Sequence, residues 1–165
     1  MRRSIVLALV TALLAVGLLV GCDDDDNGGG NGGDDAAELK ERFDTGYRPI
    51  NDEFLALGKE VGEVISTAKG QSDAALATKF KSLATRVAAL KPRLDRLEPP
   101  PEYEEDAKRV SEAMALVGRD LDEIALAADA GDAAAARTHT QDLVRHSEEV
   151  RIARRKLARR TGAKV

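Results

Sequence analysis

The sequence has a single cysteine and only two histidines among its 165 residues. One cysteine excludes a disulfide within the chain, so the folded part depends on packing for its stability. No Cys-x-x-Cys-His run is present, which excludes covalently attached haem. No Glu-x-x-His pair is present either, which excludes the di-iron arrangement of ferritin-like bundles.

Motifs of the common enzyme classes are also missing. The chain has no glycine-rich phosphate loop and no serine-centred nucleophile elbow. Covalent catalysis needs a nucleophile with a base and an orienting group. Most acidic residues here fall instead on the polar faces of predicted helices, where they are solvated. We therefore expect a protein that is not an enzyme.

No excess of one charge marks the part of the chain that can fold. The whole chain carries a net charge of −4, and loss of Arg2 and Arg3 would leave −6. The six aspartates between residues 23 and 35 account for all of that negative charge. Residues 36–165 are therefore balanced in charge, which argues against a nucleic-acid-binding domain.

The N-terminus carries the most specific motif. Arg2 and Arg3 precede an apolar run over residues 5–20, and the segment ends in Leu19-Val20-Gly21-Cys22. The run has 16 residues, fewer than the ~20 that cross a hydrocarbon core. An ordinary secretory signal would end in an Ala-x-Ala-like site instead. The segment resembles the signal peptide and lipobox of bacterial prolipoproteins.

This resemblance implies where the protein is found. Residues 1–21 would be a signal peptide that is removed during export, and the Cys22 thiol would carry a diacylglycerol-type lipid with at least two acyl chains in all. Two acyl chains hold a protein firmly at a bilayer, whereas one chain binds only marginally. The implied location is a bacterial cell membrane, with the domain anchored on its extracytoplasmic side.

Residues 22–35 join this anchor to the folded part. After Cys22 they contain only aspartate, asparagine and glycine, so they are predicted to form a flexible tether. The spacing from Asp23 to Asp34 also matches an EF-hand calcium loop, whose twelfth position needs a bidentate glutamate. Asp34 occupies that position, and low-complexity runs match such spacing easily. The tether is therefore the preferred interpretation.

Four apolar stripes follow, each with alternating steps of four and three residues. They run from Phe43 to Ala68, from Leu76 to Leu97, from Tyr103 to Ala128, and from Ala136 to Leu157. This spacing places the apolar residues on one face of an α-helix, whereas strands need a period of two. The domain over residues 36–165 is therefore predicted to be all-α.

Residues that end and start helices separate the stripes: Gly70 with Ser72, Pro99-Pro100-Pro101, and Gly131-Asp132. The predicted helices span about 36–69, 72–98, 101–129 and 132–161. Connections this short force neighbouring helices to run antiparallel, which predicts an up-down-up-down four-helix bundle. Pro49 and Pro92 lie inside predicted helices and are expected to bend them.

Both histidines lie on the fourth stripe. His139 and His146 are seven residues apart and share one helix face, and bundle interiors commonly hold haem or metal on such faces. Counting inward from the loops places Met114 near His146 as a soft ligand. The alternative is that both histidines lie at the edge of the stripe and bond to hydroxyls or water. A small metal or haem carrier is therefore the second functional hypothesis, after a non-enzymatic interaction or binding module.

The fourth predicted helix ends in a cluster of basic residues: Arg154, Arg155, Lys156, Arg159 and Arg160. In the predicted bundle this end lies beside the tether, so the cluster would face the membrane or a partner. Each such charge contributes ~1 kcal/mol near an anionic leaflet. The alternative is internal neutralisation, because the acidic start of the third helix lies at the same end.

Overall fold

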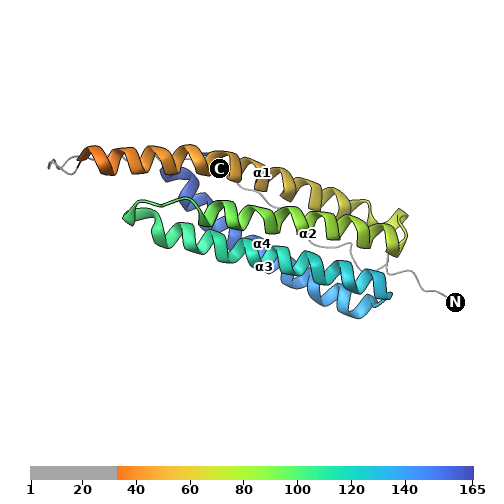
Figure 1. Ribbon diagram of the computed structural model, residues 1–165. Coiled ribbons are helices and arrows are strands. Elements are labelled where there is room, and N and C mark those ends of the chain that lie inside the picture. Colours follow the sequence, from red (N-terminus) through yellow and green to blue (C-terminus); the bar gives the residue numbers. More distant parts are fainter. Residues whose placement is uncertain (1–32) are drawn as a thin grey trace.

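The computed structural model describes residues 33–165, which form four long α-helices with no strand among them (Figure 1). The helices are α1 (Gly33–Ser66), α2 (Asp73–Asp95), α3 (Glu104–Ala130) and α4 (Ala133–Thr161). Two 3₁₀ turns, η2 (Ala68–Gly70) and η3 (Pro101–Tyr103), lie in the connections. The predicted all-α class is confirmed for this part of the chain. The signal peptide, Cys22 and the tether up to residue 32 lie outside the described residues.

The helices begin and end at residues suited to those positions. The Ser72 hydroxyl and the Asp132 carboxylate accept hydrogen bonds from backbone N–H groups in the first turns of α2 and α4, which otherwise lack partners. Helices α3 and α4 are each followed by a glycine in the left-handed region, Gly131 with φ 69° and Gly162 with φ 65°. Glycine adopts this conformation without the steric penalty of a Cβ.

The connection between α2 and α3 is longer than the sequence predicts. Helix α2 ends at Asp95 rather than near 98, and α3 begins at Glu104 rather than near 101. The three consecutive prolines at 99–101 explain the difference, because a proline disfavours helical geometry in the residue before it. By contrast, α1 and α2 continue as helices through Pro49 and Pro92.

The core consists of the predicted stripes. All eight residues of the third stripe, from Tyr103 to Ala128, are buried. The second stripe is also buried except for Leu97, which is half-buried. On α1, Phe54, Val61 and Val64 are only half-buried. Helix α3 is therefore the most enclosed of the four, and the second half of α1 is more open.

Side-chain contacts join each helix to two others. They are Arg86–Glu60 and Arg93–Glu53 between α2 and α1, Ser111–Asp95 and Lys81–Asp122 between α3 and α2, His146–Asp120 and Lys156–Asp106 between α4 and α3, and Arg154–Asn51 and Arg48–Thr161 between α4 and α1. The first turns of α1 extend past the end of its neighbours (Figure 1).

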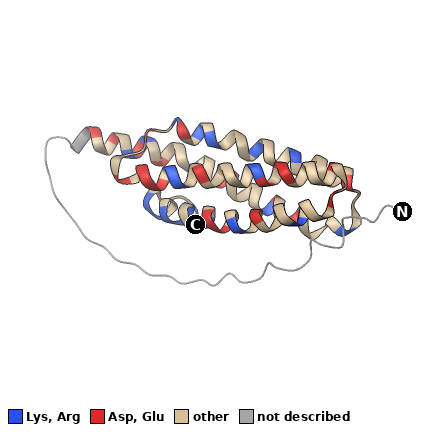
Figure 2. Ribbon diagram, turned by 90° about the horizontal axis from the view of Figure 1, so that it is seen from below, with Lys and Arg blue, Asp and Glu red and all other residues tan. Residues whose placement is uncertain are grey.

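The outer surface carries both signs of charge. Basic and acidic residues are intermixed along the helices (Figure 2), and most of the ion pairs lie on exposed side chains. Among the described helices, none combines the length and apolar character needed to cross a membrane.

Candidate functional site

Buried polar side chains gather at the end of the molecule where α1 begins and α4 ends. Among the residues whose burial the structure describes, eight polar or charged ones are buried: Asp44, Asn51, Asp106, Ser111, Asp120, His146, Arg154 and Thr161. The contacts of five of them, Asp44, Asn51, Asp106, Arg154 and Thr161, lie at this end. Burying a polar group costs folding free energy unless the group has a hydrogen-bond or ion-pair partner. The partners of these groups therefore indicate which chemistry this end of the molecule can perform.

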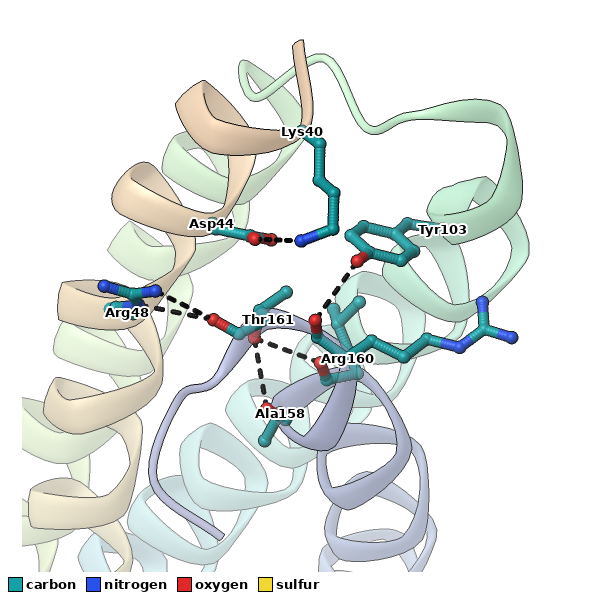
Figure 3. A network of polar contacts seen from close by, with 8 residues as sticks. Lys40, Asp44, Arg48, Tyr103, Ala158, Arg160 and Thr161 are labelled. Atoms are coloured by element: carbon teal, nitrogen blue, oxygen red, sulfur yellow. Dashed lines mark hydrogen bonds and ion pairs between the residues drawn. The ribbon is translucent and has the colours of Figure 1, made fainter. Parts of the chain in front are cut away.

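An aromatic cluster forms the apolar part of this end. Phe43 stacks on Tyr47 with ring centres 5.9 Å apart and packs against Tyr103 at 5.8 Å. The Tyr103 hydroxyl donates a hydrogen bond of 3.1 Å to the backbone carbonyl of Arg160. Two cations lie by the Tyr103 ring, Lys40 Nζ and Arg160 Cζ, each 5.7 Å from its centre (Figure 3). Tyr103 thus joins the start of α3 to both α1 and α4.

A second set of contacts fastens α1 to the end of α4. Arg48 Nε and Nη2 donate to the Thr161 carbonyl at 3.3 and 3.2 Å (Figure 3). Arg154 Nη1 donates to Asn51 Oδ1 and to the Lys164 carbonyl, both at 2.9 Å. Asn51 Nδ2 donates to the same carbonyl at 3.0 Å. We call Arg48, Asn51 and Arg154, with these two carbonyls, the α1–α4 clasp.

Two buried groups at the clasp, the Arg154 guanidinium and the Tyr47 hydroxyl, are incompletely paired among the described residues. The Arg154 side chain is 5% exposed, and among residues 33–165 it forms no ion pair with a carboxylate. Burial lowers the pKa of Arg154. Tyr47 is 0% exposed and its hydroxyl has no hydrogen-bond partner within the described residues. Burial raises the pKa of Tyr47, while the charge of Arg154 acts to lower it.

The predicted basic cluster is divided between the interior and the surface. Arg154 lies inside the helix packing rather than on the surface. Lys156 and Arg160 lie 2.8 and 3.6 Å from the buried carboxylate of Asp106. Arg155 is half-buried and Arg159 is exposed. The acidic start of α3 therefore neutralises two of the five predicted residues.

His146 has a specific partner. Its Nδ1 lies 2.5 Å from Asp120 Oδ2, and both side chains are buried. Asp120 Oδ1 lies 3.7 Å from Arg119 Nη2. A carboxylate in this position fixes the tautomer and orientation of the imidazole ring.

The other two predicted ligands differ from His146 in their burial. Met114 is fully buried in the core and His139 is half-buried. Within the described residues, no group of three or more His, Cys, Asp or Glu side chains is arranged to hold a metal ion. A site formed by His139, His146 and Met114 stays a prediction.

Several residues of these clusters were not among the predicted site residues, including Tyr47, Arg48, Asn51, Asp106 and Asp120. Asp106 and Asp120 are two heptads apart and each precedes a residue of the third stripe. That repeat is the only sequence signal that would have pointed to them, because it places both carboxylates at the same flank of one helix face.

Comparisons with known proteins give no match. No family model matches the chain, and no curated protein or solved structure is similar to it.

Proposed function

We propose that the protein is a non-enzymatic binding or interaction module, held on the extracytoplasmic side of a bacterial cell membrane by a lipid on Cys22. The observation that carries the proposal is the segment Leu19-Val20-Gly21-Cys22 at the end of an apolar run. An aspartate- and glycine-rich stretch and then a helical domain follow it. A lipid anchor, a tether and a domain without a spanning helix together suit such a protein.

The helix contacts support an up-down-up-down bundle for the domain. The contacting pairs are α1 with α2, α2 with α3, α3 with α4, and α4 with α1, and residue numbers run in opposite directions in each. In such a bundle the start of α1 and the end of α4 share one end, so the tether leads to the clasp. Arg155 and Arg159, which form no ion pair among the described residues, would then meet anionic headgroups.

The anchor is tested by Cys22→Ala in the full chain. Because lipid attachment to the thiol precedes cleavage in this class of protein, the variant should remain a larger, unlipidated precursor. The measurements are incorporation of labelled palmitate, apparent mass, and partition between membrane and soluble fractions. Ser4→Ala, within the same N-terminal segment, is the control and should be processed like the wild type. A Cys22→Ala protein that is shortened and still bound to the membrane would contradict the anchor.

The alternative function is a small carrier of metal or haem through His139 and His146. One observation favours it: the His146 ring is oriented by Asp120, as ligating histidines are by their outer carboxylates. The absorbance spectrum and metal content of the purified protein separate the two proposals. A colourless protein that takes up neither haem nor copper removes the carrier and leaves the interaction module.

A further inference from the structure

Two guanidinium groups in the clasp bind only neutral oxygen atoms. Arg48 donates two hydrogen bonds to the Thr161 carbonyl, and Arg154 donates to the Lys164 carbonyl and to Asn51. Within residues 33–165 neither guanidinium lies within ion-pair distance of a carboxylate. Guanidinium groups bind carboxylates and phosphates more strongly than carbonyls, since both partners are then charged.

Two other cations near the clasp are paired with carboxylates. Lys40 Nζ lies 2.6 Å from Asp44 Oδ2, and Lys164 Nζ lies 3.2 Å from Asp52 Oδ2. Among the described residues, Arg48 and Arg154 therefore keep two positive charges that no carboxylate pairs. The negative end of the α4 dipole opposes an added anion, but it amounts to only about half a charge.

A buried hydroxyl beside the clasp supplies a further unused donor. Tyr47 lies one helical turn before Asn51 on α1, and its hydroxyl is fully enclosed without a partner. Asn51, one turn further along the same helix, accepts a hydrogen bond from Arg154, which places Tyr47 on the side of α1 that faces the clasp. A buried O–H without a partner among the described residues needs an explanation, and an acceptor on a bound ligand would supply one.

The segment after α4 covers this place. Gly162, in the left-handed conformation, turns the chain back so that the Lys164 carbonyl reaches Arg154 and Asn51. A Cβ at Gly162 would lie 3.6 Å from Arg48 Nη2, so the turn passes beside this edge of the guanidinium. The Lys164 carbonyl of this segment occupies the position that one oxygen of an anion would take.

We propose that Arg48, Asn51, Arg154 and Tyr47 form a binding site for an oxyanion, the carboxylate or phosphate group of a ligand. On binding, Arg154 and Asn51 exchange the Lys164 carbonyl for an oxygen of the anion, and the Tyr47 hydroxyl donates to another. Residues 162–165 are displaced from the clasp in the same step. The site is independent of the lipid anchor, so its failure and that of the proposed function are distinguishable.

The test uses the full chain in neutral detergent, with Tyr103→Phe as the background. Tyr47 is then the only tyrosine, and the chain has no tryptophan, so the emission reports on Tyr47 alone. Inorganic phosphate and acetate are titrated separately against chloride at equal ionic strength. We expect a saturable change in emission and a rise in melting temperature with at least one of the two. The two arms show whether the site takes phosphate or carboxylate groups.

Four variants make the result specific. Arg48→Met and Arg154→Met should weaken binding at least tenfold, whereas Arg159→Met removes an exposed charge near the same helix end and should leave it unchanged. Arg48 is exposed, so its variant folds even if loss of buried Arg154 does not permit folding. Tyr47→Phe, followed by melting temperature, should also weaken binding. The proposal is overturned if neither anion differs from chloride, or if Arg159→Met loses as much affinity as Arg48→Met.

Discussion

Tyr47 combines a fully buried ring with a hydroxyl that has no partner in the described part of the chain. Removing one member of a buried polar pair costs about 1–3 kcal/mol, because the other member stays desolvated. In the folded protein the Tyr47 hydroxyl is desolvated in this way. Such a group is retained where it has a use, and it also makes stability depend on pH.

Stability should fall in alkali because of Tyr47. Burial raises the pKa of Tyr47 above the ordinary value of 10.0, so the folded protein keeps the phenol neutral while the unfolded chain ionises. Below about pH 10 Tyr47 is neutral in both states and does not lower the free energy of unfolding. As the pH rises from there toward the pKa of the folded state, ionisation in the unfolded chain lowers that free energy. By pH 11 the loss should be about 1.4 kcal/mol, measured by urea unfolding between pH 9 and 11.

Tyr47→Phe should remove this alkaline loss. Tyr103→Phe is the matched control, because it also removes one phenol while Tyr47 stays in place. If Tyr47→Phe retains the same fall in stability as Tyr103→Phe, burial of Tyr47 is not its cause.

Two glycines in different settings show how the ends of helices differ from their middles. Gly58 lies inside α1, and an added Cβ would meet no atom within 4 Å. Gly131 follows α3 with φ 69°, also with no atom within 4 Å of an added Cβ. An added Cβ would therefore have the same room at Gly58 and Gly131, and the two positions differ only in backbone conformation.

The same substitution should therefore have opposite effects at the two positions. Gly58→Ala should stabilise the fold by about 0.5–1 kcal/mol, because alanine loses less backbone entropy in a helix. Gly131→Ala should destabilise it by about 1–2 kcal/mol, because a Cβ strains the left-handed conformation. Urea midpoints of the two variants measure both effects. A shift in the same direction for both would show that conformation is not the deciding factor.

The spacing of apolar residues was sufficient to predict the helices and their buried faces. That prediction succeeds because the period of apolar residues depends only on the local geometry of the helix. All residues of the third stripe are accordingly buried. Burial of Asn51, Asp106, Asp120 and Arg154 could not be predicted in the same way. Each lies one position beside a stripe residue, where the period does not distinguish a surface from a helix contact.

Contacts between residues distant in the sequence could not be predicted either. Arg154 meets Asn51 across 103 residues and Arg48 meets Thr161 across 113. A cluster of arginines near a helix end favours a solvated or membrane-facing surface when only the local sequence is considered. The structure instead places Arg154 in the interior, because α1 and the segment after α4 both supply oxygen atoms to its guanidinium.

The four helices differ in how firmly they are held in the molecule. Fourteen residues of α3 are buried, whereas only six are buried among the described side chains of α1: Phe43, Asp44, Tyr47, Ile50, Asn51 and Leu57. Polar contacts between α1 and α4 are confined to residues 48–52 of α1 among the described residues. Helix α1 should therefore open more readily than α3.

The clasp also has a consequence for the order in which the chain folds. It joins two positions separated by 113 residues, and closing a loop of that length costs about 4 kcal/mol of chain entropy. Pairing of α2, α3 and α4 involves shorter loops, so the clasp should close after the rate-limiting step.

Asn51→Ala should consequently speed unfolding about tenfold and leave the folding rate within about twofold. Leu121→Ala, in the enclosed face of α3, should slow folding instead. Stopped-flow denaturant jumps measure both rates, and a slower folding rate for Asn51→Ala would place the clasp in the folding nucleus. If the clasp closes last, the chain completes its core first and then fastens its two distant ends together.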